Sequence, residues 1–240
     1  MINNKYLNRI VGSGFLANHL KTNEELFKKL NIYVYAAGVS NSQCTDNNLL
    51  EIDKKRVFNF KNEIDQKEMI VYFSTCSIDD PSRSKTPYVK NKLIIEDFIK
   101  KNFKKYLIIR FPELVGVSKN KTTLINFFFD RVKNNISFDL WANARRNLIG
   151  VDDALIILLK ILKKRDYENT VMNIANPKSF FATGIIKAIE ELILKKAKYH
   201  LVEKGEANWE IDISKTFQLI KSCNIDFNNN YLKNILKKYF

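Results

Sequence analysis

The sequence has few of the residues that build metal centres and disulfide frameworks. Its 240 residues include three cysteines and two histidines. Cys44, Cys76 and Cys223 are an odd number and show no metal-ligand spacing, and His19 and His200 are too few for a Cys/His zinc site. We therefore expect no metal, and thiols that are reduced and structural.

Long apolar runs are also missing. No stretch approaches the roughly 18 to 20 unbroken apolar residues of a membrane span. The first residues, MINNKYLNRIVGSG, lack the charged and apolar regions of a secretory signal. We therefore expect no membrane span and a soluble, cytoplasmic protein. At 45% hydrophobic residues the chain can bury a real core, which makes a disordered protein improbable.

The chain is rich in positive charge, with a formal net charge of +14 at pH 7. The lysines are scattered through the whole sequence rather than gathered into one arm, which is typical of solvated surfaces. Some attraction for anionic, phosphate-bearing substrates is a second interpretation. No basic segment is interleaved with aromatic residues as in single-strand binders, so we expect no nucleic acid as partner.

Short apolar runs alternate with helical patterns along the chain. This alternation predicts an α/β fold with a doubly wound parallel sheet covered on both faces. The predicted strands are residues 6–12, 31–38, 68–77, 105–116, 137–141 and 170–175. The predicted helices are residues 15–30, 49–57, 88–101, 124–132, 151–162, 182–195 and 213–222. We predict a single domain over residues 1–240, with a small C-terminal lobe formed mainly by about residues 176–240.

Two glycines and an alanine, Gly12, Gly14 and Ala17, lie between the first predicted strand and the first predicted helix. In a dinucleotide-binding turn the first glycine allows the bend, the second lets the backbone approach a pyrophosphate, and the third small residue lets helix and strand pack closely. An ordinary strand end explains the same spacing. The acidic residue expected about 20 positions on is replaced by the run YAAG.

Tyr88 and Lys92 lie four residues apart on a predicted helix and so share a face. The helix directly follows the predicted strand that ends in FSTCS, which brings hydroxyl groups to the carboxyl edge of the sheet, where open α/β folds bind ligands. A packed tyrosine and a solvated lysine are the structural alternative. The position of the pair, rather than the pair itself, favours a site.

The order of several short motifs along the chain resembles that of the extended short-chain dehydrogenase/reductase superfamily. Within this superfamily, the chain is most similar to the NAD-dependent epimerase/dehydratases that act on nucleotide sugars. The segments that carry the resemblance are GSGFLA, YAAGVS, FSTCSI, YVKNK, IIRFPELVG, RRNLIGVDDAL and DISKTFQLI. The resemblance implies a Rossmann-like sheet and NAD or NADP as cofactor. It also implies a nucleotide-sugar substrate, a place in polysaccharide biosynthesis and, as in many members, a homodimer.

The resemblance also assigns roles to residues. It implies Thr75, Tyr88 and Lys92 as the catalytic trio, with the Tyr88 phenol as general acid/base, and Thr75 and Arg146 as substrate-binding residues. Arg145 is the alternative to Arg146. The implied cofactor-binding residues are Gly12, Ser13, Gly14, Phe15, Leu16, Ala37, Gly38, Tyr88, Lys92 and Pro112.

The stretch between the first predicted helix and NIYVYAAG is too short for the second and third strands of such a sheet. We therefore predict a Rossmann-like sheet shortened on the side where adenosine would lie. This shortening motivates a second hypothesis, a non-catalytic protein of the same fold that binds a nucleotide or a partner. Asp152 and Asp153 resemble paired carboxylates but fit a helix start better, and Cys76 has no histidine near it in sequence to activate it.

Overall fold

The chain divides into two compact units in the computed structural model, which describes residues 8–118, 120, 123–164 and 166–240. The first unit comprises Met1–Asp79, Arg83–Phe111 and Leu158–Asn173, and the second Asp80–Ser82, Pro112–Ile157 and Ile174–Phe240. The predicted organisation as one domain with a small lobe over about residues 176–240 stays a prediction.

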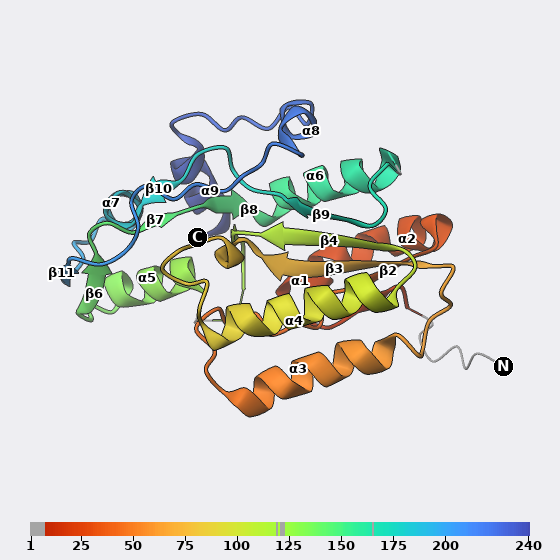
Figure 1. Cartoon of the computed structure of the whole chain (residues 1–240). Helices are drawn as coiled ribbons and strands as arrows, with labels where there is room; N and C mark the ends of the chain where they lie inside the picture. The colour runs from red at the N-terminus through yellow and green to blue at the C-terminus, as the bar shows by residue number, and fades with distance from the viewer. Residues whose placement is uncertain (1–7, 119, 121–122, 165) are drawn as a thin grey trace. The chain divides into compact units, whose positions relative to one another are not determined.

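A parallel sheet of five strands, in the order β1-β2-β3-β4-β9, forms the centre of the first unit (Figure 1). Its strands are β1 (Ile10–Val11), β2 (Ile32–Tyr35), β3 (Met69–Thr75), β4 (Tyr106–Phe111) and β9 (Thr170–Asn173). One row of paired residues crosses all five strands, through Ile10, Val34, Val71, Leu107 and Thr170. The predicted α/β fold with a parallel sheet is confirmed.

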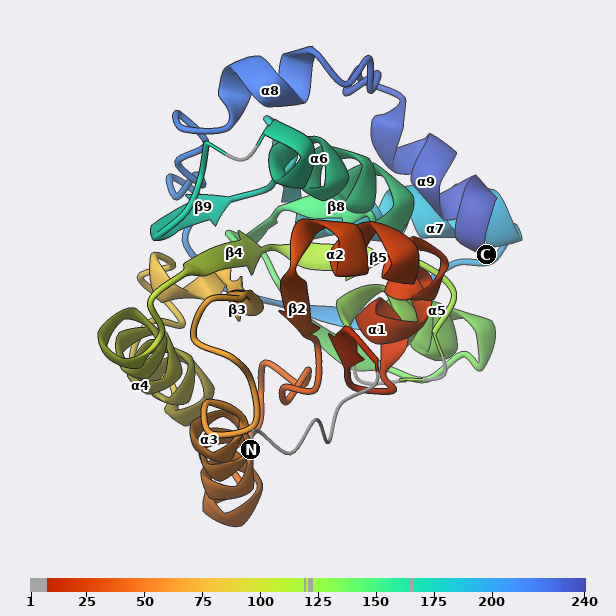
Figure 2. The same cartoon turned by 90° about the vertical axis from the view of Figure 1, so that its right-hand side faces the viewer.

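Helices cover both faces of this sheet (Figure 2). On one face lie α3 (Asn47–Phe60) and α4 (Pro87–Asn102), and their buried side chains pack with those of the strands. The residues of this core include Val57, Phe60, Ile70, Tyr72, Ile95, Ile99 and Ile108. The opposite face is covered by α1 (Phe15–Leu20), the 3₁₀ turn η1 (Lys21–Asn23) and α2 (Glu24–Leu30).

The sheet ends at β1, a strand of two residues. Within the described residues β1 pairs with β2 alone, and the chain from β1 to β2 forms α1, η1 and α2 without a further strand. The prediction of a shortened sheet is therefore confirmed. The predicted continuous helix over residues 15–30 is interrupted by η1, where Thr22 and Asn23 are weak helix formers.

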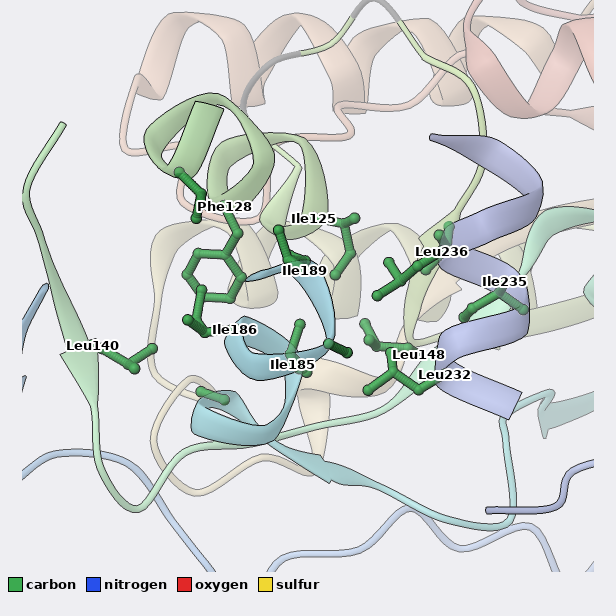
Figure 3. Packing of buried hydrophobic residues seen from close by; sticks show 14 of the residues in the cluster. Ile125, Phe128, Leu140, Leu148, Ile185, Ile186, Ile189, Leu232, Ile235 and Leu236 are labelled. Atoms are coloured by element: carbon green, nitrogen blue, oxygen red, sulfur yellow. The ribbon is translucent and has the colours of Figure 1, made fainter. Parts of the chain in front are cut away.

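The second unit contains short paired strands and three packed helices. The strand pairs are β5 (Glu113–Val115) with β8 (Leu148–Gly150), β6 (Phe138–Trp141) with β11 (Tyr199–Val202), and β7 (Arg145–Arg146) with β10 (Phe180–Phe181). The helices α5 (Leu124–Lys133), α7 (Ala182–Ile193) and α9 (Tyr231–Tyr239) pack their apolar faces together. Figure 3 shows Ile125, Phe128, Ile186, Ile189 and Leu236 in this core.

Two tyrosines of α9 hold the start of α6 (Val151–Lys164). The Tyr231 hydroxyl donates to Asp153 Oδ2 at 2.6 Å, and the Tyr239 hydroxyl donates to Asp152 Oδ2 at 2.9 Å. The amide of Gly150 donates to the Tyr231 oxygen at 2.9 Å. Both aspartates thus lie in the first helical turn, as predicted, and they also anchor the last helix of the chain.

The structure differs from the prediction in three further places. The predicted strand over residues 105–116 is two strands, because Pro112 has no N–H to donate and β4 ends before it. The last predicted helix begins only at Phe217, in α8 (Phe217–Lys221), since Asp212 accepts the Ser214 amide at 2.8 Å and forms a turn. The helix α9 was not predicted.

Candidate active site

The glycine turn leads from β1 into α1. Gly12 has φ +129°, a conformation that residues with a side chain rarely adopt, and a Cβ there would lie 2.6 Å from the carbonyl oxygen of Ala36. Gly14 caps α1 in extended conformation, with φ −78°, and a Cβ there would meet no atom within 4 Å. The first glycine therefore makes the close turn against β2, and the second leaves open space at the start of a helix.

The other predicted cofactor residues of this turn lie at the same helix start. Ser13 is exposed, and Phe15 and Leu16, which begin α1, are half-buried. The side-chain amide of Asn18 donates to the Ser13 carbonyl at 3.2 Å, which ties the turn to the helix. The first N–H groups of a helix have no partner within the helix, so this turn suits an anion.

The run that follows β2 brings a third glycine, Gly38, beside the predicted catalytic lysine. Ala37 and Gly38 are half-buried, and a Cβ on Gly38 would lie 2.8 Å from Lys92 Nζ. The same point is 3.6 Å from Oδ1 of Asp53, a buried residue of α3. Gly38 therefore leaves room for the amine, a reason for this glycine that the sequence motif alone does not give.

Tyr88 and Lys92 lie one turn apart on α4, and both are buried. Thr86 caps the helix by accepting the Val89 amide at 3.3 Å, and a proline at the first position fits the same start. Lys92 Nζ lies 5.8 Å from the centre of the Tyr88 ring. The predicted sharing of one helix face thus brings the phenol and the amine together.

The Lys92 amine also reaches the end of β3. It donates to the Tyr72 hydroxyl at 3.1 Å and to the Phe73 carbonyl at 3.4 Å. Thr75 ends the same strand, and its Oγ1 accepts the Ser77 amide at 3.1 Å, which caps the turn η2 (Cys76–Ile78). Because α4 packs against both β3 and η2, one corner of the first unit contains the elements of all three predicted catalytic residues.

Lys92 is 3% exposed, and its environment acts on its charge in two directions. Burial lowers the pKa of Lys92, because it penalises the charged amine, and the carboxylates of Asp53 and Glu96 raise it. Asp53 Oδ2 accepts the side-chain amide of Asn91 at 3.2 Å. Sequence analysis missed Asp53 and Asn91, and the only local signal was an aspartate on the apolar face of a predicted helix.

A second buried carboxylate supports the strand beside the site. Glu96 is fully buried and accepts two hydrogen bonds from the Arg110 guanidinium, at 2.9 and 2.8 Å. This bidentate pair joins α4 to β4. Cys76 is buried next to it and donates to the Arg110 carbonyl at 3.4 Å. Burial raises the pKa of the Cys76 thiol, so the group stays protonated and has a packing role.

The remaining predicted residues belong to the second unit. Pro112 is its first residue after β4 and is half-buried. Arg146 ends β7, with its guanidinium 5.8 Å from the Trp141 ring centre. Arg145 donates to Glu210 and to the Ser179 carbonyl, both at 3.2 Å, so its guanidinium is already engaged. Arg146 is engaged as well, since its guanidinium donates to the Arg145 carbonyl at 3.0 Å, so hydrogen bonding does not distinguish the two arginines.

The described part of the chain has neither a metal-binding cluster nor a membrane-spanning helix. Among residues 8–118, 120, 123–164 and 166–240, no three histidine, cysteine, aspartate or glutamate side chains are grouped so that they could hold a metal ion. None of the helices described for these residues has the length and apolar character needed to cross a membrane.

Comparison with known proteins gives matches of structure alone. No family model matches the chain, and a search of curated proteins gives no match. The solved structures that match include RMD from Pseudomonas aeruginosa complexed with NADPH, with TM-score 0.73, 13% identity, and 95% of this chain and 96% of that one covered.

Two further structures match over similar lengths. UDP-glucuronic acid 4-epimerase from Bacillus cereus, in complex with UDP-glucuronic acid and NAD, has TM-score 0.67 and 14% identity, with 94% of this chain and 90% of that one covered. dTDP-4-dehydrorhamnose reductase from Bacillus anthracis str. Ames, in complex with NADP, has TM-score 0.70 and 15% identity, with 96% and 97% covered. The chain therefore has the fold shared by nucleotide-sugar epimerases and reductases of known structure.

Proposed function

We propose that this protein is an NAD(P)-dependent oxidoreductase or epimerase that acts on a nucleotide-activated sugar. The observation that carries the proposal is the buried Lys92 amine, which lies beside the Tyr88 ring, Gly38 and the end of β3. Burying a lysine amine is unfavourable for the free energy of folding, and Lys92 lies at the position where the sequence motifs predict a catalytic pair. The nucleotide-sugar enzymes of the same fold, crystallised with NADPH, NAD or NADP, support the reaction class.

The residues present fit one half of the cofactor. The open space at Gly14 and the start of α1 suit a pyrophosphate, and Ala37, Gly38 and Lys92 suit the nicotinamide ribose. The shortened sheet has no strand beyond β1 to flank adenosine within the described residues. When bound, the nicotinamide would supply hydride to a sugar carbon or accept hydride from it.

The side chains of the site supply the proton transfer. The Tyr88 phenol gives a proton to the sugar oxygen or takes one from it. A phenol ordinarily ionises near pH 10, and the Lys92 ammonium beside it favours the phenolate at lower pH. Thr75 donates a hydrogen bond to the same sugar oxygen and orients it. Arg146 binds the diphosphate of the substrate, since a guanidinium matches phosphate oxygens in pairs.

Calorimetry with NAD(H) and NADP(H) tests the cofactor site, with Gly14→Asp as the variant that adds a negative charge in the open space. A screen of nucleotide sugars then compares the wild type with Tyr88→Phe and with the control Tyr106→Phe, a change at the amino end of β4. We expect Tyr88→Phe to lose at least about 100-fold in turnover while binding is kept, and Tyr106→Phe to keep both. A folded wild type that binds neither cofactor at millimolar concentration would favour the non-catalytic alternative.

We propose a homodimer formed through α3 and α4. Leu49 and Ile52 of α3 and Ile94 of α4 are 50%, 45% and 47% exposed, and the two helices contact each other, so these large apolar side chains are candidates for an interface. Sedimentation of the wild type and of Ile94→Glu tests this assembly, and a wild-type monomer at micromolar concentration would reject it. We also propose a cytoplasmic location, with which the three free thiols agree. A role in polysaccharide biosynthesis is part of the same proposal and follows from the proposed nucleotide-sugar substrate.

A further inference from the structure

A buried carboxylate lies behind the proposed catalytic pair. Asp53 of α3 is 2% exposed, and burying a carboxylate in a core is unfavourable unless hydrogen bonds and an opposite charge compensate for the lost water. Asn91 supplies one hydrogen bond to Oδ2, and Oδ1 accepts none. The compensating charge must therefore come from a nearby cation.

Lys92 is that cation by position. Its amine and Asp53 Oδ1 lie beside the same glycine, at 2.8 and 3.6 Å from the point where a Cβ of Gly38 would stand. The atoms that accept hydrogen bonds from Lys92, the Tyr72 hydroxyl and the Phe73 carbonyl, are both neutral. The charge of the amine consequently depends on carboxylates beyond these direct partners.

The titratable groups that face Lys92 come from three elements: Asp53 from α3, Glu96 and Tyr88 from α4, and Tyr72 from β3. Gly38 brings no side chain. Glu96 is engaged by a guanidinium and also lies 3.5 Å from the Lys100 amine, so much of its charge is already balanced. Among the described residues, Asp53 accepts a side-chain hydrogen bond only from the neutral Asn91 amide, so Asp53 is the carboxylate left to balance the charge of Lys92.

We propose that Asp53 is a positioning residue for the reaction: its carboxylate keeps the Lys92 amine protonated and beside Gly38, and Asn91 keeps the carboxylate in place. The inference rests on the proposed function, because it assigns Lys92 a part in catalysis. Burial lowers the pKa of Lys92, and Asp53 acts against this effect more strongly than any other charge. Without Asp53 the amine would lose its proton at lower pH and would no longer favour the Tyr88 phenolate.

The charge of Lys92 can be measured without substrate. We would follow the Lys92 side chain by NMR during a pH titration, assign its signal with Lys92→Met, and compare the wild type with Asp53→Asn. We expect the Lys92 titration to move down by at least one pH unit in Asp53→Asn, a change of at least about tenfold in the ionisation constant. The matched control is Glu51→Gln on the same helix, whose exposed carboxylate pairs with Lys54 and should leave Lys92 unchanged.

Turnover gives the second measurement. In Asp53→Asn the alkaline fall of kcat/KM should begin at lower pH than in the wild type, so the ratio of wild-type to variant activity grows with pH. A purely structural loss would lower activity by the same factor at every pH. If Asp53→Asn does not fold, Asn91→Leu removes the hydrogen bond to the carboxylate and should move Lys92 in the same direction.

The outcomes separate the two proposals. An unchanged Lys92 titration in the folded variant, or a shifted titration with an unchanged pH profile of kcat/KM, would overturn the role of Asp53 even if the enzyme is active. A wild type that turns over no nucleotide sugar would overturn the proposed function and with it the reaction role of Asp53. The NMR titration would in that case still report whether Asp53 and Lys92 are coupled.

Discussion

The two glycines of the first turn should fail in different ways when they are replaced. At Gly12, alanine must adopt φ +129°, and its Cβ would lie 2.6 Å from Ala36 O and 2.9 Å from Ala37 N. These are backbone atoms at the end of a central strand, so no side-chain rotation relieves the clash. Backbone strain of about 1–3 kcal/mol and overpacking of a similar size add up to an expected loss of about 2–6 kcal/mol in the free energy of unfolding.

Gly14 is the matched control for that change. Its φ of −78° is open to any residue, and no atom lies within 4 Å of a Cβ. We expect Gly14→Ala to change the free energy of unfolding by less than about 0.5 kcal/mol, because lost helix capping and reduced freedom of the unfolded chain oppose each other. Gly14→Asp should be neutral or slightly stabilising, since aspartate is a preferred helix cap.

Urea unfolding followed by circular dichroism measures both effects, with an unchanged slope indicating that the transition itself is the same. In thermal unfolding, Gly12→Ala should lower Tm by roughly 4–24 °C, at about 2–4 °C for each kcal/mol. The loss of cofactor affinity, in contrast, should be large for the stable variant Gly14→Asp. We expect its affinity to fall at least about 100-fold, because the carboxylate repels the pyrophosphate. Equal stability of Gly12→Ala and Gly14→Ala would refute this account of the turn.

Three further predictions concern the interior of the first unit and the thiols. Gly38→Ala places a Cβ 2.8 Å from the flexible end of Lys92. We therefore expect turnover to fall at least about tenfold, while the free energy of unfolding in urea changes by less than about 1 kcal/mol. Unaltered turnover would contradict this prediction. Glu96→Ala removes one partner of the buried bidentate pair with Arg110 and should lower the free energy of unfolding, measured in urea, by about 3–5 kcal/mol. A negligible change would show that the pair does not stabilise the protein. Burial raises the pKa of the Cys76 thiol, so at pH 8 a thiol reagent should modify the half-buried Cys223 at least about tenfold faster than Cys76. Mass spectrometry follows both rates, and similar rates in the folded protein would reject the packing role of Cys76.

The parallel sheet could be predicted because its signal is local. Strands β2, β3 and β4 are almost continuous runs of buried apolar residues, and long amphipathic helices separate β2, β3 and β4. The order of the site segments along the chain then places Thr75, Tyr88 and Lys92 at one end of the sheet, because parallel strands bring their carboxyl ends to a common edge. The short distance from Gly14 to Ile32 was enough to predict the missing strands.

The interactions between distant residues could not be predicted in the same way. Asp53 and Asn91 are 38 residues apart, and although Asp53 lies on the apolar face of its predicted helix, nothing in the local sequence indicates which residue it contacts. The hydrogen bond of Asp153 to Tyr231 joins residues 78 apart, so the sequence around α6 indicated only a helix start. Such pairs depend on how the helices pack onto the sheet. The hydrophobic periodicity of a helix predicts which of its faces is buried, but it does not predict which residues that face contacts.

Three close contacts connect the glycine turn, the end of β2 and the proposed catalytic lysine, and none of them involves a strand beyond β1. Gly12 lies against the end of β2, Gly38 at that end lies against the Lys92 amine, and the amine bonds to the Phe73 carbonyl of β3. Each approach lies within β1, β2, β3 and α4 or directly after one of them. The described residues form no strand beyond β1, so the proposed cofactor site has less surface where adenosine would lie, while the geometry of the proposed proton transfer does not depend on such a strand. Under the proposed function, the shortened fold would keep this chemistry, because the residues proposed for the nicotinamide side and the surface expected beside adenosine belong to different strands.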